Sequence, residues 1–482
     1  MTDGHEVTGP DMSAGPMPQE PQLPIRRANH AEPSRLAMLE SVWHRFHAGQ
    51  PPLKRGGRVA EVSATQYKVR GLSEVARLGD LVEHRSHGAV RRGEIVRIGA
   101  DAVVVAPFEH STDTGIGDVV FRRGPLTVMP HPSWRGRVID ALARPIDGGA
   151  PLLRMPQQAG AGHDPAPAAL SRQRVDTPFV TGVRVIDIFT PLCFGQRLGV
   201  FAGSGVGKST LLAMLAAADA FDTVVVALVG ERGREVREFL EDTIGATSIA
   251  KTVAVVATSD ESAMMRRRAP DTAMRVAEHF RDRGHRVLLV LDSITRFAHA
   301  LREVATGTGE PPVARGYPAS VFTDLPKLLE RAGPGAEGSG SITAIISVLV
   351  DGDDHNDPVA DSVRGILDGH VVLDRTIAEQ GRYPPVNPLS SISRLAGKAW
   401  SPEQQVLVTR LKSMISRFED TRDIRLLGAY QGGVDAELDM AVRQVPLIYE
   451  ALTQSPKDRS SPDPFADLAR HLKVKQNADA GN

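Results

Sequence analysis

The fold of this chain is decided by Phe201-Ala202-Gly203-Ser204-Gly205-Val206-Gly207-Lys208-Ser209-Thr210. Apolar residues flank this stretch, so it is typical of a strand end, a glycine-rich loop and a helix start. Three of the five residues 203–207 are glycine, which lets successive backbone N–H groups turn inward without a Cβ clash. The N-terminus of the following helix favours an anion. The stretch predicts a cradle for the phosphates of a nucleoside triphosphate, the alternative being an ordinary glycine-rich turn.

The residues of the cradle have separate predicted roles. The usual pattern is G-x-x-x-x-G-K-[S/T], and here its first position is Ala202, with Gly203 beside it supplying the permissive backbone. We expect Lys208 to reach the β- and γ-phosphates and Ser209 to ligate Mg²⁺. The predicted phosphate-binding residues are Gly203, Ser204, Gly205, Val206, Gly207, Lys208, Ser209 and Thr210.

Two acidic residues follow apolar strands and belong to the same predicted crevice. Asp292 ends the predicted strand 286–292, and ligands of an open parallel sheet bind beyond the carboxyl ends of its strands. Asp292 would hold the water shell of Mg²⁺, or cap the helix that begins at Ser293. Glu231 follows the predicted strand 223–229, and we expect it to be the catalytic carboxylate that orients the attacking water, with Arg232 as its electrostatic neighbour. The alternative is a solvated charge cluster.

The pattern around the cradle predicts an α/β domain. Near-continuous apolar strands separated by helices indicate a mainly parallel sheet buried on both faces. The predicted strands are 197–202, 223–229, 252–256, 286–292, 342–350 and 370–373, and the predicted helices are 208–220, 234–242, 261–283, 293–304 and 321–332. Pro270 would interrupt or kink the third of these helices.

The rest of the chain divides by composition. Proline-rich residues 1–34 predict a disordered tail, and short β-rich pieces between 57 and 128, after an amphipathic helix at 36–47, predict a small closed barrel. From residue 402 only helical patterns remain, with a marginal helix near 465–472. We predict the domains 1–34 (tail), 35–125 (helix and β-barrel), 126–398 (nucleotide-binding core), 399–460 (C-terminal helices) and 461–482 (tail).

Composition limits the classes of function. The 482 residues carry 57 Lys plus Arg and 58 Asp plus Glu, and this near-neutral balance argues against a dedicated nucleic-acid binder. Cys193 is the only cysteine, which fits a reducing compartment. We find no apolar run of ~18 residues and no signal-peptide pattern, and therefore expect a cytoplasmic protein whose membrane contact is peripheral.

Several linked motifs resemble the rotary-type ATPase family. They are the cradle, TGVR (181–184), GQR (195–197), GERGRE (230–235), DSITRF (292–297) and ARGYP (314–318). Within that family, DDHNDP (353–358) and ADSVRGILDGH (360–370) resemble the flagellar protein-export (type III secretion) ATPase. The resemblance covers about residues 57–452 and implies a RecA-like P-loop core.

The resemblance also implies an activity and its residues. It implies an ATP hydrolase in a homohexameric ring that uses ATP and Mg²⁺. Lys208 and Ser209 would be the phosphate and Mg²⁺ residues, Glu231 the catalytic carboxylate and Asp292 the residue of the metal shell. In such a ring Arg394, in the stretch SISR (391–394), would be an arginine finger that reaches the nucleotide of the adjacent subunit. Family members have an aromatic adenine platform past the Ser-Arg pair, where this chain reads SPEQQ (401–405) and offers only Trp400, which is out of place.

The resemblance implies partners and leaves alternatives open. The partners would be a stator-like regulatory protein at residues 1–50, a central stalk protein at loop 353–357, an export-gate membrane protein and export chaperone–cargo complexes, and no nucleic acid. The hydrolysis would energise flagellar protein export. The alternatives are a virulence-type secretion ATPase, a non-catalytic ring subunit, and an RNA translocase of the transcription-terminator type, which would need a basic, aromatic-bearing barrel.

Overall fold

The computed structural model describes residues 55–86, 88–109, 114–155, 170–350, 357–458 and 461–479. Arg55–Asn482 forms one compact unit. The tail and helix expected before residue 50 lie outside the described residues, as do residues 353–356 of the loop assigned to a stalk partner.

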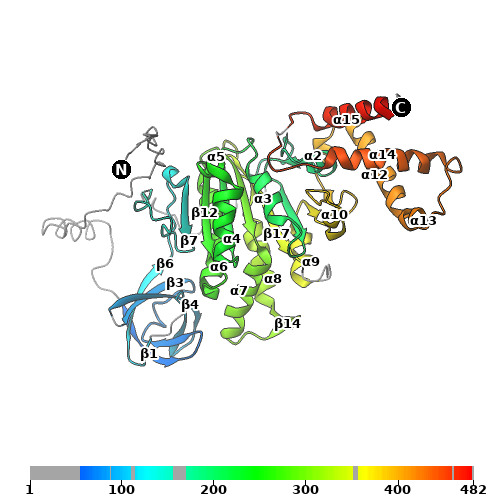
Figure 1. Cartoon of the computed structure of the whole chain (residues 1–482). Helices are drawn as coiled ribbons and strands as arrows, with labels where there is room; N and C mark the ends of the chain where they lie inside the picture. The colour runs from blue at the N-terminus through cyan, green and yellow to red at the C-terminus, as the bar shows by residue number, and fades with distance from the viewer. Residues whose placement is uncertain are drawn as a thin grey trace, which may run out of the picture. The chain divides into compact units, whose positions relative to one another are not determined.

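The first part of the described chain is a closed six-stranded barrel, as predicted (Figure 1). Its strand order is β1-β2-β5-β4-β3-β6. The strands are β1 (Gly56–Val62), β2 (Tyr67–Arg70), β3 (Asp80–Ser86), β4 (Ala89–Ile98), β5 (Ala102–Pro107) and β6 (Val119–Pro125). Sequence analysis missed β3, because its polar His84 is an inward-facing residue that obscures the apolar alternation. His84 is buried and bonds Thr114 through Nε2 at 3.0 Å.

The core is a mainly parallel sheet with the order β19-β18-β10-β17-β13-β11-β12-β7. Alternate residues of a strand enter different hydrophobic clusters: Val225 and Val229 pack with α6, and Val224 and Val226 pack with α3. The sheet is therefore covered on both faces, as the strand pattern predicts. Its strands are β7 (Arg137–Asp140), β10 (Arg197–Ala202), β11 (Thr223–Val229), β12 (Thr252–Ala257), β13 (Arg286–Asp292), β17 (Ser341–Leu349), β18 (Gly369–Val372) and β19 (Ile392–Ser393), with β16 (Gly333–Pro334) antiparallel to β17.

The five predicted core helices are present with shifted ends, and five further helices in the described part of the chain were not predicted. The helix α6 runs unbroken through Pro270, whose side chain is buried with the apolar face of the helix, so tertiary packing outweighs the local penalty of proline. The predicted helix 234–242 is α4 followed by a π-helical turn at Phe239–Thr243. The helices are α2 (Arg184–Phe189), α3 (Lys208–Ala216), α4 (Gly233–Glu238), α5 (Gly245–Ile249), α6 (Ala263–Arg281), α7 (Ile294–Gly307), α8 (Ala319–Leu329), α9 (Pro358–Ile366), α10 (Arg375–Glu379) and α11 (Ala396–Ala399).

Short elements connect these layers. Two small antiparallel pairs stand apart from the main sheet, β8 (Pro178–Phe179) with β9 (Leu192–Cys193) and β14 (Pro312–Ala314) with β15 (Tyr317–Pro318). A 3₁₀ turn at Pro132–Trp134 buries Trp134, whose Nε1 donates to Leu153 O at 2.6 Å.

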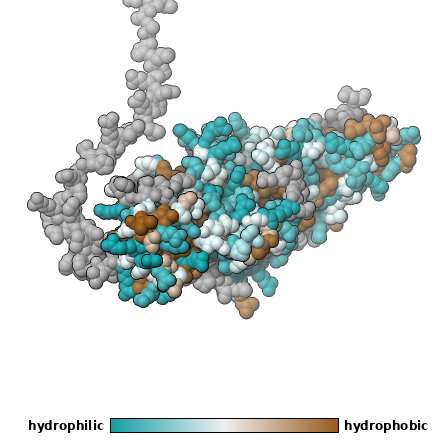
Figure 2. Space-filling model, turned by 90° about the horizontal axis from the view of Figure 1, so that it is seen from below, coloured by the Kyte–Doolittle hydropathy of each residue, from teal (hydrophilic) through white to brown (hydrophobic). Residues whose placement is uncertain are grey.

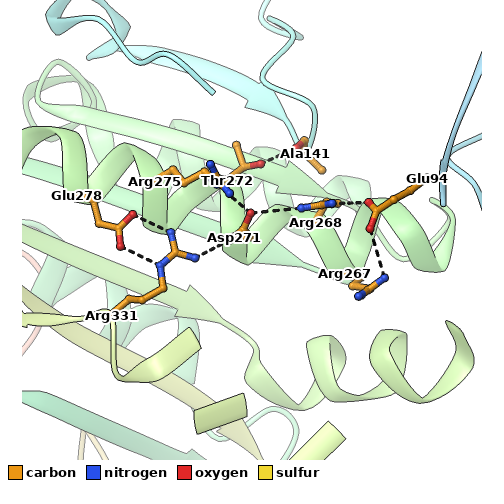
Figure 3. Close-up of polar contacts among 9 residues, drawn as sticks. All are labelled: Glu94, Ala141, Arg267, Arg268, Asp271, Thr272, Arg275, Glu278 and Arg331. Atoms are coloured by element: carbon orange, nitrogen blue, oxygen red, sulfur yellow. Dashed lines mark hydrogen bonds and ion pairs between the residues drawn. The ribbon is translucent and has the colours of Figure 1, made fainter. Parts of the chain in front are cut away.

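A row of charged residues joins the barrel to α6 (Figure 3). Glu94 of β4 is buried and accepts from Arg268 Nε at 2.6 Å. Further along α6, Asp271 accepts from Arg275 Nε at 3.0 Å, and Arg331 bridges Asp271 and Glu278. This row, Glu94, Arg267, Arg268, Asp271, Arg275, Glu278 and Arg331, is named the α6 charge row below.

The chain ends in helices, as predicted, but the last helix spans Pro464–Asp479 and is longer than the marginal helix expected near 465–472. They are α12 (Pro402–Asp420), α13 (Arg422–Leu426), α14 (Ala436–Leu452) and α15 (Pro464–Asp479). A capping box of Ser401 and Gln404 starts α12. Among the described residues no helix is both long and apolar enough to span a membrane. The face shown in Figure 2 is mostly hydrophilic, with apolar residues in separate small groups.

Candidate functional site

The predicted cradle joins β10 to α3. The strand ends at Ala202, the loop covers the next residues, and Gly207 caps the helix that begins at Lys208. Gly205 and Gly207 have φ angles of 77° and 97°, a left-handed region that favours glycine. The backbone N–H groups at the start of α3 have no partners within the helix and are available to an anion.

Three predicted site residues lie together at the carboxyl edge of the sheet. Lys208 Nζ lies 2.5 Å from Asp292 Oδ1 and 3.7 Å from Glu231 Oε1. β11 and β13 are neighbouring parallel strands, so Asp292 at the end of β13 and Glu231 just after β11 lie at the same edge of the sheet. One ammonium group thus stands between two carboxylates.

The electrostatics of this trio are unbalanced. Glu231 Oε1 is buried and has no hydrogen-bond partner among the described residues. Burial raises the pKa of Glu231 above its usual value, and the nearby Asp292 carboxylate raises it further, while Lys208 opposes both effects. The site therefore holds a poorly solvated carboxylate that would gain from a positively charged or proton-donating neighbour.

The alternative role for Asp292, capping the next helix, is wrong. The N-cap of α7 is Ser293, whose Oγ accepts from Arg296 N at 3.3 Å. The carboxylate of Asp292 is only 3% exposed and is bound to Lys208 instead.

Arg232 does not lie against Glu231 as an electrostatic partner. Its side chain is 76% exposed and pairs with Glu235 at 3.4 Å. The neighbouring Arg234 is similarly exposed and pairs with Glu238. The description as a solvated charge cluster therefore fits Arg232 in this structure.

Arg394 lies at the other end of the cradle strand. It follows β19, and its N–H donates to Asp368 O at 2.9 Å, while Asp368 N donates to Arg197 O at the start of β10. The five residue steps from Arg197 to Ala202 span about 17 Å. The structure therefore does not bring the exposed Arg394 to the cradle of its own chain.

An aromatic residue that sequence analysis missed lies beside the cradle. A Cβ built on Gly207 would lie 3.7 Å from Tyr383 Cε1, and the Tyr383 side chain is 48% exposed. The signal was the sequence YPP at 383–385, before the Ser-Arg pair rather than after it. Trp400, the substitute considered from sequence, packs against the hydrophobic core.

The residues predicted to hold Mg²⁺ supply suitable atoms. Ser209 is exposed on the first turn of α3, and its hydroxyl and the Asp292 carboxylate are the oxygen donors that Mg²⁺ prefers. Within the described part of the chain no group of three or more His, Cys, Asp or Glu could hold a metal ion. A metal here would need phosphate and water oxygens as further ligands.

Comparisons with known proteins agree along most of the chain. Residues 182–393 match the ATP synthase alpha/beta family, nucleotide-binding domain, and residues 400–472 match the T3SS EscN ATPase C-terminal domain. The chain is 59% identical to a flagellum-specific ATP synthase of Agrobacterium fabrum, over 95% of this chain and 96% of the relative. It is 41% identical to a type 3 secretion system ATPase of Xanthomonas euvesicatoria, over 88% and 95%.

A solved structure agrees with the fold. It is the assembled ATPase EscN in complex with its central stalk EscO from the enteropathogenic E. coli type III secretion system. Its TM-score is 0.78 at 38% identity, covering 86% of this chain and 100% of that chain.

Proposed function

The chain belongs to the ATP synthase alpha/beta family, in its branch of flagellum-specific and type III secretion ATPases, and we propose that Lys208, Glu231 and Asp292 form its ATP-hydrolysing site. The protein is an ATPase of flagellar protein export. The observation that carries the site assignment is the ammonium of Lys208 between two carboxylates at the mouth of a phosphate cradle.

Each residue of the site has a chemical task. The cradle, residues 203–210, binds the phosphates through backbone N–H groups, and Lys208 moves from the carboxylates to the β- and γ-phosphates. Glu231 orients the attacking water, and its raised pKa makes it a better acceptor for the water proton. Ser209 and Asp292 would hold Mg²⁺, which supplies charge neutralisation at the phosphates.

We propose that the catalytic unit is a homohexameric ring in which Arg394 acts on the nucleotide of the next subunit. Arg394 is exposed and far from its own cradle, which is the geometry that a finger acting in trans requires. An arginine finger typically contributes 10³ to 10⁵ in rate. Catalysis would then depend on assembly.

Tyr383 is proposed as the residue that stacks on the adenine ring. Its ring is half-exposed and adjoins Gly207, where a nucleotide held by the cradle would extend. Replacing it with Phe should preserve nucleotide affinity, and replacing it with Ala should raise the KM for ATP with little change in kcat.

The flagellar assignment is favoured over the virulence-type one by identity, 59% against 41%. We propose a central stalk partner, because the assembled relative EscN binds one. The other proposed partners are a stator-like regulator at residues 1–50, an export-gate membrane protein and export chaperone–cargo complexes. The proposed location is the cytoplasm, at the inner face of the membrane.

The other two classes of function fit the site less well. A non-catalytic ring subunit would not need Glu231 beside Lys208. An RNA translocase would need exposed aromatic residues on the barrel. Tyr67 is buried inside the barrel, 1% exposed, and Phe108 is buried against the nucleotide-binding core, 3% exposed.

The test is ATP hydrolysis per subunit across a range of protein concentrations, with Glu231→Gln as the control for contaminating activity. We expect specific activity to rise with concentration and the control to be inactive. Adding Arg394→Ala subunits should then poison the wild-type rings. If the wild type hydrolyses no ATP at any concentration, the catalytic assignments are wrong.

A further inference from the structure

A buried polar cluster holds the strand that carries Arg394. The side chain of Gln196 is completely buried, and its Nε2 donates to Asp368 O at 3.2 Å and to Ser393 Oγ at 3.1 Å. Its Oε1 accepts from Cys193 N at 3.0 Å, so the whole amide group is used. A buried amide with all its bonds made adopts a single orientation.

The same cluster fixes the backbone of Arg394. The carbonyl of Asp368 accepts from both Gln196 Nε2 and Arg394 N, the latter at 2.9 Å. The carboxylate of Asp368 accepts from Arg197 N at 2.9 Å, at the first residue of β10. The backbone of Arg394 is therefore linked through Asp368 to Gln196 and to Arg197, the first residue of β10. The side chain of Arg394 is exposed and forms no hydrogen bond or ion pair with the described residues.

This arrangement contrasts with ordinary exposed arginines of the chain. An exposed arginine at a strand end needs no buried amide beneath it. Here Ser393 is buried and bonded, and the next residue is exposed. Because the backbone of Arg394 is fixed, less conformational freedom is lost when its guanidinium binds a partner.

We propose that Gln196 and Ser393 are positioning residues for Arg394, which they hold in the orientation needed to reach the nucleotide of an adjacent subunit. The proposal rests on the proposed function, in which Arg394 acts in trans. Neither residue touches the nucleotide. Their effect is on the rate of hydrolysis at the neighbour, because a misplacement of about 1 Å can cost 10²-fold in rate.

The experiment measures single-turnover hydrolysis of ATP and nucleotide affinity for Gln196→Met, Ser393→Ala and Ser393→Thr. We expect Gln196→Met to lose about 10²-fold in rate and Ser393→Ala about tenfold, with nucleotide affinity unchanged. Ser393→Thr keeps the hydroxyl and should keep the rate. Thr343→Val is the matched control, since Thr343 Oγ1 accepts from Gly195 N at 2.9 Å beside Gln196 but does not contact β19.

A double-mutant cycle separates positioning from a general structural effect. In the Arg394→Ala background, Ser393→Ala should lower the rate no further, because residues that act as a unit are not additive. Equal losses in both backgrounds would overturn the proposal, as would wild-type rates in both Gln196→Met and Ser393→Ala. If Gln196→Met does not fold, Ser393→Ala decides.

A failure of the proposed function would give a different result from a failure of the positioning role. If Arg394→Ala alone retains the wild-type rate, Arg394 is not a finger, and the positioning role falls with it. If Arg394→Ala is inactive while Gln196→Met and Ser393→Ala are fully active, the finger stands and only the positioning role is overturned.

Discussion

Two groups of buried charge, the α6 charge row and the charges at the cradle, differ in how completely their members are paired. In the α6 charge row, Asp271 is surrounded by Arg268, Arg275 and Arg331. At the cradle, the ion pairs of Glu231 and Asp292 among the described residues are both with Lys208. The first group holds more arginines than acids, and the second more carboxylates than cations.

The difference appears in the pKa values of the acids. The three arginines lower the pKa of Asp271 to about 2 despite its burial. Burial and the Asp292 carboxylate raise the pKa of Glu231. A carboxylate with a lowered pKa contributes to stability, whereas one with a raised pKa is held in an unfavourable charged state. The α6 charge row therefore stabilises the fold, whereas the cradle charges, which we propose to be catalytic, reduce stability.

The largest effect is expected at the cradle, where two carboxylates face one lysine. Glu231→Gln removes the proposed general base and should lower kcat by about 10²- to 10⁴-fold, because an amide oxygen is a poor proton acceptor. The fold should be as stable as the wild type or more so, because a disfavoured charge is lost. The measurements are single-turnover hydrolysis and a urea unfolding midpoint.

Glu241→Gln is the matched control, since Glu241 is exposed and pairs with the exposed Arg237 rather than with a residue at the cradle. It should keep most of the activity. A Glu231→Gln protein that hydrolyses ATP at the wild-type rate would show that another group activates the water.

The second-largest effect is expected in the α6 charge row, whose acidic residues are paired with arginines. Arg331→Met leaves Asp271 and Glu278 without a shared partner and should cost about 3–5 kcal/mol of stability, as expected for one member of a buried ion-pair network. Hydrolysis at a temperature where the variant is folded should be close to wild type. The midpoint of urea unfolding tests the first statement and the ATPase rate the second.

A stable Arg331→Met protein would mean that water reaches the α6 charge row and replaces the lost guanidinium. A folded variant with much reduced kcat would mean instead that the α6 charge row also affects the site. The contrast between a stabilising row and a catalytic cradle would then be wrong.

The sequence predicted the core better than its margins. The strands β10, β11 and β13 begin and end at the predicted residues, because long apolar runs between turn signals leave little ambiguity. The short strand β7 and the polar β3 were missed, since their pairing depends on distant partners. The unbroken α6 could not be predicted from Pro270, because the packing that tolerates the proline involves residues far away in the sequence.

The site shows the same limit. The sequence placed Lys208, Glu231 and Asp292 at one edge because each lies at or beyond the carboxyl end of a core strand, and these strand ends meet at one edge of a parallel sheet. Nothing local in the sequence tells that Arg232 turns outward to Glu235, or that Tyr383 approaches Gly207 across 176 positions of chain. The α6 charge row was likewise not predicted, since its members come from β4, from α6 and from Arg331, two positions after the end of α8.

A third, smaller effect comes from acid. The ordinary pKa of Asp is 3.8, and that of folded Asp271 is about 2, so its contribution is present above pH 4 and is lost as the pH falls from about 4 to about 2. The contribution is about 2 kcal/mol at one pKa unit per 1.36 kcal/mol. Comparing the unfolding midpoints of the wild type and Asp271→Asn over this range isolates it from the other acids.

The difference between these two proteins should be largest near neutral pH and shrink below pH 4. Were it constant with pH, the charge of Asp271 would not be what stabilises the row.

The smallest effect is expected at an arginine–glutamate ion pair that is exposed to solvent. Arg237 and Glu241 form an ion pair one turn apart, at 2.9 Å, with side chains 77% and 60% exposed. Solvent and salt screen such a pair, and the cost of ordering two long side chains offsets most of its attraction. Arg237→Met should leave both the unfolding midpoint and the ATPase rate unchanged, at low and at high salt. A clear loss of stability would show that ion-pair geometry alone, without burial, decides stability in this chain, and the contrast between the α6 charge row and the cradle would then need another explanation than the completeness of pairing.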